Sequence, residues 1–259
     1  MISTVQRAIE CRPPGSRLVL LSDFDGTLAD FHPDPAVPML TSERRALLEV
    51  LSLDPAKSVG LVSGRRLVDL RRRTALPSCV YFAGTHGMEI AVDGRHWRHP
   101  DLGLAKAYVG DLTTRLNDAL SRIPGVLVED KEVSVALHTR GTPLDRRAEA
   151  EALAEACAAP WLASGQLKRL EGNAVIEYLP NISCHKGDAT QWIADDVGER
   201  FDQEPWVVFL GDDVTDEDAF KVIDRGIGVL IGSRPTAASH QLPSIAEVDA
   251  LLRWLSERE

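Results

Sequence analysis

The chain contains few cysteines, and no two of them lie close together. Its 259 residues include 4 cysteines and no C-x-x-C pair: Cys11, Cys79, Cys157 and Cys184. A zinc site or a disulfide framework needs closely spaced or paired cysteines, so this spacing excludes both as predictions. It favours a reducing compartment, and we expect a cytoplasmic protein.

The sequence also lacks long apolar runs and an excess of basic residues. No stretch approaches the ~20 apolar residues of a membrane-spanning helix, and the first residues contain no apolar core of a signal peptide. We therefore expect neither export nor membrane anchoring. The formal net charge of −10 argues against general nucleic-acid binding, because phosphate contacts require a basic face. Nothing in the sequence predicts an oligomeric state.

The apolar residues that are present alternate with helical segments in a strand-turn-helix order. This order predicts an α/β fold with a doubly wound parallel sheet, whose strands are residues 18–21, 58–62, 79–83, 206–210 and 226–231. Helices are expected over 42–53, after Arg65, from Lys186 and over 245–258. The first of these should bury Ala46, Leu47, Val50 and Leu51. Three prolines place 31–38 in a loop, and glycines at 84–89 predict a hairpin.

The middle of the chain has a different pattern. A long amphipathic helix from Leu102 precedes two strands at 126–130 and 133–138, and a second helix at 148–159 precedes a hairpin near Gly172. Two helix-strand-strand units predict a small antiparallel sheet with its helices on one face. We therefore expect an inserted α+β domain over residues 95–180, within a core formed by 1–94 and 181–259.

Polar residues follow three of the core strands directly. Asp23 and Asp25 follow the first strand, Ser63 the second, and Asp212 begins the acidic segment 212–218. In a parallel sheet these ends share one edge, where the acids would repel one another unless a cation lay among them. A magnesium ion, which proteins hold with a few carboxylate oxygens, would offset this repulsion, and we expect Asp23 and Asp212 to be its side-chain ligands. Taken alone, Asp23 and Asp25 are also typical of a turn, and residues 212–218 are also typical of a capped helix start.

Lys186 adds a positive charge at the predicted return to the core. A lysine here would offset charge on a phosphoryl group, although a single lysine is also commonly an exposed surface residue. The ordered set Asp23, Ser63, Lys186, Asp212 resembles the haloacid dehalogenase superfamily of aspartyl-phosphate phosphohydrolases, with its Rossmann-like core. The resemblance implies that Asp23 is the nucleophile and Asp25 the general acid and then base. Ser63 and Lys186 would bind the phosphoryl oxygens, and Asp25 joins the expected metal ligands.

Three longer motifs narrow the resemblance to trehalose-6-phosphate phosphatases. They are G-T-H-G-M-E at 84–89, V-E-D-K at 128–131 and G-D-D-V-T-D-E-D-A-F at 211–220. The resemblance implies a mobile cap domain, in which Glu129, Lys131 and Glu177 bind sugar hydroxyls. The other expected substrate-binding residues are Gly64, Arg65 and His86. In one departure, Leu179 precedes Pro180 where the family usually has a basic residue.

Several alternatives stay open at this point. The leading hypothesis is hydrolysis of the phosphosugar trehalose 6-phosphate with Mg²⁺, and its alternative is a phosphatase or mutase for another phosphosugar. A signalling receiver also combines a strand-end Asp, a Ser or Thr and a Lys, but it is shorter and has no second acid.

Single residues have alternatives too. Glu129 and Lys131 are also typical of an ion pair on a solvent-exposed sheet face. His86 is also typical of a residue that forms a local hydrogen bond. The arginine run at 71–73 is typical of a solvated helix face. Asp213 and Asp216 either bind metal directly or orient it through water.

Overall fold

The computed structural model describes residues 2–32, 34 and 36–258. The chain divides into two compact units. The first comprises the chain up to Trp97 and from Cys184 onward, and the second is Arg98–Ser183. Two of the three prolines that predicted a loop, Pro33 and Pro35, lie outside the described residues.

The first unit is built on an eight-stranded sheet. Parallel pairing runs from β12 to β3, and β4 pairs antiparallel with β3 through a short turn. The central strands are continuous apolar runs because both of their faces are covered. The order across the sheet is β12 (His240–Leu242), β11 (Gly226–Ile231), β10 (Pro205–Gly211), β1 (Arg17–Ser22), β2 (Lys57–Val62), β3 (Tyr81–Gly84), β4 (Glu89–Val92) and β5 (Arg95–Arg98).

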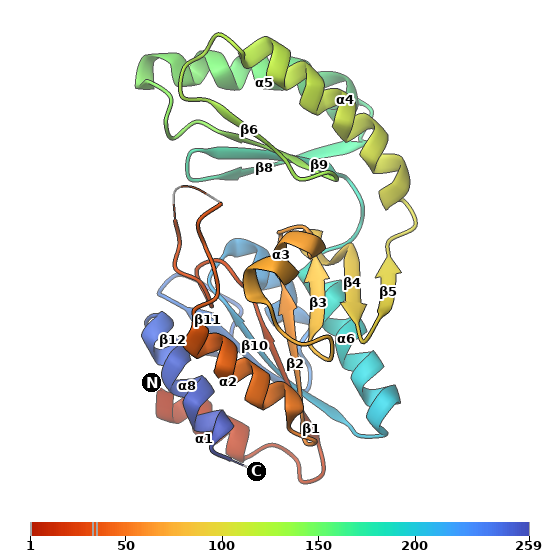
Figure 1. The fold of residues 1–259 in the computed structure, drawn as a ribbon, viewed down its shortest axis with the longest axis vertical. Coiled ribbons are helices and arrows are strands. Elements are labelled where there is room, and N and C mark those ends of the chain that lie inside the picture. Colours follow the sequence, from red (N-terminus) through yellow and green to blue (C-terminus); the bar gives the residue numbers. More distant parts are fainter. Residues whose placement is uncertain (1, 33, 35, 259) are drawn as a thin grey trace. The chain divides into compact units, whose positions relative to one another are not determined.

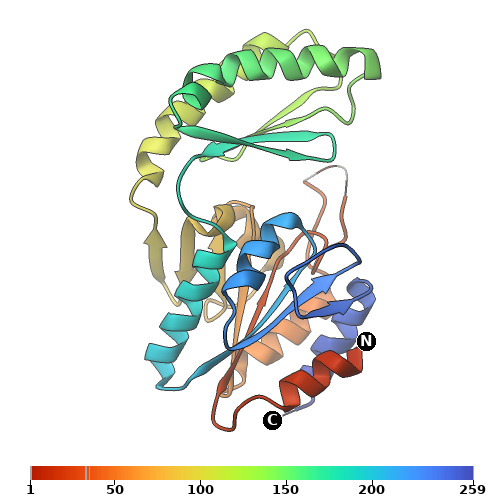
Figure 2. The same ribbon diagram turned by 180° about the vertical axis from the view of Figure 1, so that it is seen from behind.

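Helices cover both faces of this sheet (Figures 1 and 2). On one face an apolar cluster joins the strands to α1 (Ile2–Glu10), α2 (Ser42–Leu53), α3 (Leu67–Thr74) and α8 (Ile245–Ser256). On the other face a second cluster joins them to α6 (Lys186–Phe201) and α7 (Glu217–Val222). The predicted doubly wound α/β fold is therefore confirmed.

The second unit is an antiparallel α+β sandwich. Its four strands lie in the order β6 (Leu127–Asp130), β7 (Val135–His138), β9 (Val175–Pro180) and β8 (Leu167–Gly172). One face of this sheet packs against α4 (Leu102–Leu120) and α5 (Leu144–Ala163) around a single apolar cluster. The opposite face carries the polar side chains described below.

The structure adds one helix to the predicted elements and corrects the predicted buried face of another. Residues 2–10 precede the first strand as a helix, α1, which buries Val5 and Ile9. In α2 the buried face is rotated from the predicted one: Val50 is 53% exposed, whereas Arg44 is buried and forms an ion pair of 2.6 Å with Asp249. An arginine can lie on the buried face of this helix because its charge is paired there.

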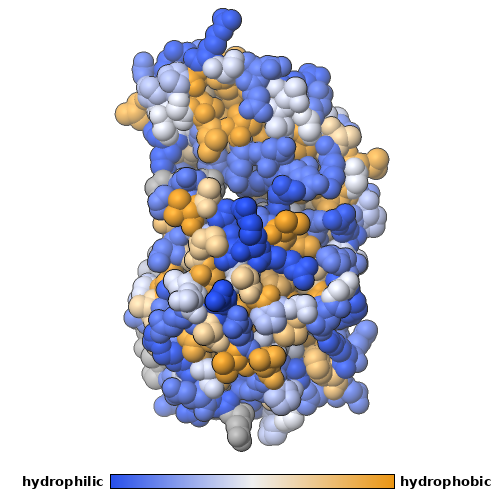
Figure 3. Space-filling view, in the orientation of Figure 1, coloured by the Kyte–Doolittle hydropathy of each residue, from blue (hydrophilic) through white to orange (hydrophobic). Residues whose placement is uncertain are grey.

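The surface carries scattered apolar side chains. Leu53, Val68, Leu104 and Leu144 are each more than 70% exposed. On the face shown in Figure 3, apolar groups are interrupted by polar ones, as on most protein surfaces. Among the described residues, no helix is both long and apolar enough to cross a membrane.

Candidate active site

The three polar strand ends of the first unit meet at one edge of its sheet. β1 lies between β10 and β2, and Ser22, its last residue, is in register with Leu210 on one side and Leu61 on the other. The backbone N–H of Asp23 donates to the carbonyl of Leu210 at 2.8 Å. Asp212 and Ser63 follow those neighbouring strands directly. The chain order reverses on either side of β1, which is where α/β sheets bind ligands.

Lys186 lies between two buried carboxylates at this edge. It opens α6, and its ammonium is 3.0 Å from Asp23 Oδ1 and 2.7 Å from Asp216 Oδ1. Burial alone would lower the pKa of Lys186, but the carboxylates of Asp216 and Asp23 outweigh that effect and raise the pKa above its ordinary value. Lys186 therefore stays charged, and the surface-lysine alternative does not describe it.

Three carboxylates form a group that is suited to a cation. One oxygen from each of Asp23, Asp212 and Asp216 lies within 4.8 Å of the others. Burial raises the pKa of Asp23 well above its ordinary value, and the neighbouring acids add to this while Lys186 opposes it. Burial likewise raises the pKa of Asp212 to about 6. Because one lysine does not balance these acids, the donor set fits a hard divalent cation with oxygen ligands.

Asp216 is already engaged through both of its oxygens. Oδ1 accepts from Lys186, and Oδ2 accepts from the backbone N–H of Asp213 at 2.9 Å. Asp216 is completely buried. These bonds fit a residue that orients the acidic loop and Lys186, whereas Asp23 and Asp212 fit direct ligation.

A glycine brings the first and last motifs into contact. Gly26 has φ +80°, and a Cβ at this position would lie 2.2 Å from Asp212 Oδ2. Any other residue would therefore displace the Asp212 carboxylate. The neighbouring Thr27 hydroxyl donates to Asp212 Oδ1 at 2.9 Å, so the Gly-Thr pair of the first motif positions the acid of the last one.

The second acid of the first motif faces an arginine. Arg65 Nε and Nη2 donate to the two oxygens of Asp25 at 2.6 and 2.7 Å, a bidentate pair. Burial lowers the pKa of Arg65, but its hydrogen bonds with Asp25 and Asp69 outweigh that effect and raise it. The structure thus places Arg65 against Asp25, and Asp25 is not a member of the carboxylate group described above.

The turn after β3 supports the loop that follows β2. The backbone N–H groups of Thr85 and His86 donate to the carbonyls of Arg65 and Ser63 at 2.7 and 3.0 Å. The imidazole of His86 packs on Gly64, where a Cβ would come within 2.7 Å of the ring. Ser63 is buried, and its Oγ accepts from the Arg65 N–H at 3.2 Å. His86 and Gly64 therefore shape the loop that carries Ser63 and Arg65.

The second unit presents its own polar group on the helix-free face of its sheet. Glu129 and Glu177 both pair in register with Ala136, so they point to the same side. Lys131 follows the last residue of β6 and lies 3.1 Å from Glu177. Glu177 also accepts from the Ser134 hydroxyl at 2.6 Å, while Glu129 pairs with His138 at 2.8 Å.

Charge on this face is nearly balanced. Burial would raise the pKa of Glu129, but the hydrogen bond with His138 and the charge of Lys131 outweigh it, so the pKa lies below its ordinary value. Carboxylates that accept and an ammonium that donates suit the hydroxyls of a sugar. Leu179, the departure noted in the sequence, is buried in β9 and offers no hydrogen bond from its side chain.

The sequence did not indicate a role for Arg234, whose side chain binds the backbone of the acidic loop. Its Nε donates to the carbonyl of Asp212 at 3.1 Å and its Nη2 to that of Asp213 at 2.6 Å. It also forms an ion pair with Glu217. A lone arginine in the loop after β11 carries no sequence signal for this contact, whereas Asp216 and Thr27 at least belong to motifs.

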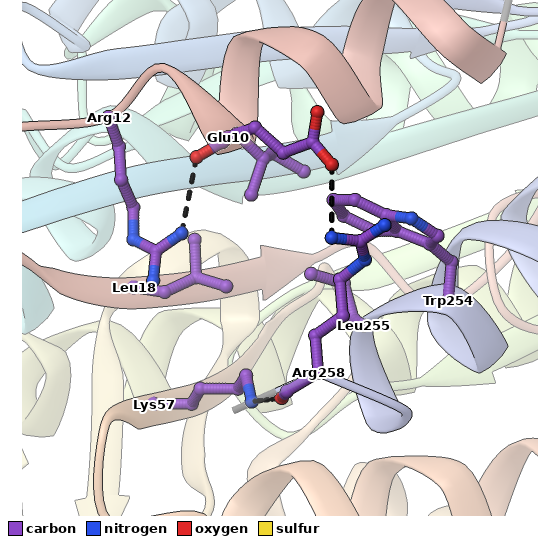
Figure 4. Close-up of a pocket in the computed structure, with 8 residues that line it drawn as sticks. Glu10, Arg12, Leu18, Lys57, Trp254, Leu255 and Arg258 are labelled. Carbon is purple, nitrogen blue, oxygen red and sulfur yellow. Dashed lines mark hydrogen bonds and ion pairs between the residues drawn. The ribbon is translucent and has the colours of Figure 1, made fainter.

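A separate pocket lies at the opposite end of the strands (Figure 4). It has a volume of about 330 Å³ and is lined by α1, α8 and the beginnings of β1 and β2. Its charged side chains are already engaged: Arg258 pairs with Glu10 at 3.0 Å, and Lys57 donates to the Arg258 carbonyl at 2.5 Å. It contains none of the predicted site residues.

Comparison with known proteins places these features in context. A family model described as trehalose-phosphatase matches residues 21–247. The trehalose-phosphate phosphatase of Mycobacterium marinum is 35% identical over 250 residues, which are 92% of this chain and 62% of that protein. The protein of that name from Mycobacterium tuberculosis H37Rv is 34% identical over 249 residues, 91% of this chain and 61% of that protein. The chain thus spans about three fifths of the length of these relatives.

Solved structures share the fold. The C-terminal domain of trehalose-6-phosphate phosphatase from C. albicans has a TM-score of 0.79 at 20% identity, covering 100% of this chain and 97% of that one. A haloacid dehalogenase-like hydrolase from Bacteroides thetaiotaomicron has a TM-score of 0.65 at 16% identity, covering 93% and 99%.

Proposed function

This chain belongs to the trehalose-phosphatase family, and from that premise we propose that it hydrolyses trehalose 6-phosphate to trehalose and phosphate. The observation that carries the proposal is the position of Lys186 between Asp23 and Asp216 at the strand edge that also carries Asp212. A buried carboxylate beside a permanently charged lysine and a cation-binding group is suited to phosphoryl transfer, where positioning and electrostatics do most of the work.

In the first step, a carboxylate oxygen of Asp23 forms a bond to phosphorus while the bond from phosphorus to the sugar oxygen breaks. The electron pair of the broken bond stays on the sugar oxygen, which takes a proton from Asp25. The Ser63 hydroxyl donates a hydrogen bond to a phosphoryl oxygen, and Lys186 offsets the negative charge beside Asp23. The product is an aspartyl phosphate and free trehalose.

In the second step, the Asp25 carboxylate takes a proton from a water molecule whose oxygen attacks phosphorus. The bond between phosphorus and Asp23 breaks, which releases phosphate and restores the Asp23 carboxylate. The bidentate pair with Arg65 fixes the direction of the Asp25 carboxylate.

The proposed cofactor is Mg²⁺, held by the side chains of Asp23 and Asp212. Asp25, the third predicted ligand, has its carboxylate engaged by Arg65, and Asp216 orients Lys186 and the acidic loop. When bound, Mg²⁺ supplies positive charge that offsets the phosphoryl oxygens. It also offsets the charge of the neighbouring carboxylates, which adds to the effect of burial in raising the pKa of Asp212.

We propose that the second unit is the cap and that it selects the sugar. Glu129, Lys131 and Glu177 supply acceptors and a donor for hydroxyl groups from one face of the sheet. The compact unit Arg98–Ser183 supports the predicted domain organisation, in which residues 95–180 form an insertion in the hydrolase core.

Replacing Glu177 by glutamine should raise the KM for trehalose 6-phosphate about tenfold with little change in kcat, since one hydrogen bond to a charged group contributes about 1.5–3 kcal/mol. Hydrolysis of p-nitrophenyl phosphate, which has no sugar, should be unchanged. The matched control is Glu149→Gln on the exposed side of α5. Equal losses with both substrates would show that Glu177 does not act through the sugar.

A second candidate substrate is another phosphosugar, which the buried Leu179 favours. The deciding experiment measures phosphate release from trehalose 6-phosphate, glucose 6-phosphate and other phosphosugars, with Mg²⁺ and with EDTA. We expect trehalose 6-phosphate to have the highest kcat/KM and all release to stop with EDTA. Equal or faster hydrolysis of glucose 6-phosphate would reject the proposed substrate.

A further inference from the structure

The arginine run on α3 is only in part the solvated helix face that its sequence predicts. Arg72 has a side chain that is 74% exposed, but that of Arg73 is only 5% exposed. Arg73 donates to the carbonyls of Ala36 and Pro38 at 2.9 and 2.8 Å and to Asp69 at 2.5 Å. The prediction is therefore wrong for Arg73, and the reason is a carboxylate one helical turn before it.

Asp69 accepts hydrogen bonds from three arginines. Its Oδ2 accepts from Arg73 Nε and from Arg65 Nη1 at 3.1 Å, and its Oδ1 accepts from Arg72 Nη2 at 2.9 Å. Burial would raise the pKa of Asp69, but the hydrogen bonds from Arg73, Arg65 and Arg72 outweigh it and hold the pKa below its ordinary value. Asp69 is thus a half-buried, ionised centre of this group.

Arg65 connects this group to the active site. One edge of its guanidinium, Nε and Nη2, binds both oxygens of Asp25, while its remaining nitrogen, Nη1, binds Asp69. The Arg65 side chain is 11% exposed. Because the guanidinium is planar and rigid, fixing Nη1 also fixes the direction in which the opposite edge meets Asp25.

We propose that Asp69 is a positioning residue that holds Asp25 in place through Arg65. The inference rests on the proposed function, in which Asp25 gives a proton to the departing sugar oxygen. Asp69 touches neither substrate nor phosphorus; it fixes the arginine that fixes the acid. Arg73 in turn anchors Asp69 to the segment that follows the first motif.

A role in positioning the acid has a signature that a merely structural role lacks. The sugar oxygen of trehalose 6-phosphate needs a proton as it leaves, whereas p-nitrophenol leaves as a stable anion. Misplacing Asp25 should therefore slow the first step for the sugar phosphate more than for the aryl phosphate. The ratio of kcat/KM for the two substrates reports this first step alone, and it does not depend on how much of the protein is folded.

The experiment compares that ratio in the wild type and in Asp69→Asn with Mg²⁺ present. General acid catalysis contributes roughly 10²–10⁴-fold, so we expect the ratio to shift about tenfold or more against trehalose 6-phosphate. Asp69→Glu, which keeps the charge but lengthens the side chain, should give a smaller shift in the same direction. An unchanged ratio in Asp69→Asn, whether both rates fall together or neither falls, would overturn the inference.

The matched control is Arg72→Gln, which removes an exposed partner of Asp69 that has no contact with Asp25, and it should leave the ratio unchanged. A shift in Arg72→Gln as large as that in Asp69→Asn would contradict the route through Arg65. The wild-type chain tests the proposed function separately from the Asp69 variants. A wild-type chain that hydrolyses p-nitrophenyl phosphate but no phosphosugar rejects the substrate and, with it, the inference.

Discussion

Replacing Asp23 by asparagine is expected to abolish phosphate release from trehalose 6-phosphate. The loss should be roughly 10⁴-fold or more, the scale seen when a nucleophile is removed from a covalent catalyst. Asparagine keeps the shape of the side chain but has no carboxylate oxygen to bond phosphorus. The measurement is free phosphate released per chain over time with saturating Mg²⁺.

The fold should survive this substitution. Asp23 is buried among other acids, and burial and their charge raise its pKa well above the ordinary value. Removing its charge relieves that repulsion, so the melting temperature should not fall. The control is Asp195→Asn on the exposed side of α6, which should retain full activity. Full activity in Asp23→Asn would show that another residue is the nucleophile.

Replacing Lys186 by methionine should cause the largest loss of stability of any single substitution considered. Lys186 is 2% exposed and pairs with Asp23 and Asp216. Methionine has a similar length but leaves two buried carboxylates without their cation, a change that costs about 3–5 kcal/mol. The measurement is the free energy of unfolding in urea, with EDTA present so that no metal replaces the lysine.

Lys106→Met provides the comparison. Lys106 pairs with Glu132 at the surface of the second unit, and both side chains are at least 34% exposed. Exposed pairs of this kind contribute about 0.2–1 kcal/mol. If Lys186→Met lost no more free energy of unfolding than Lys106→Met, Lys186 would not be the counter-charge that holds the acids together.

Much of the fold was predictable because its strands and motifs are local in sequence. The strands at 18–21 and 206–210 are uninterrupted apolar runs since both faces of the sheet are covered. The polar residues after them fall at one edge by the geometry of parallel strands alone. The alternating helices and hairpins of the second unit are equally visible in the pattern of apolar residues.

What the sequence did not reveal depends on partners that are distant in the chain. Arg44 is buried because Asp249, on the last helix, pairs with it, and no window of sequence contains both. Among the residues of α1 whose burial the structure describes, Val5 and Ile9 are the buried ones, and two residues give no clear periodic signal. β12 is three residues long and gains its place by pairing with β11.

The active site, like the fold, was predictable only in part. The residue types and their order were predictable, but the direction of each side chain was not. Arg65 was expected to bind substrate, and the sequence did not indicate that its guanidinium contacts Asp25 and Asp69. Arg73 was expected on a solvated helix face because the sequence does not show that the Asp69 carboxylate lies against three arginines.

The central claim is that Asp23 carries the phosphoryl group, and the Asp25→Asn variant tests it most directly. With p-nitrophenyl phosphate this variant should complete the first step, which needs no acid, and stall at the second, which needs a base. We predict a burst of one nitrophenolate per chain and, after acid quenching, a phosphoryl group on the peptide that contains Asp23. A phosphoryl group on any other residue, or steady turnover with neither burst nor phosphorylated Asp23, would contradict the account.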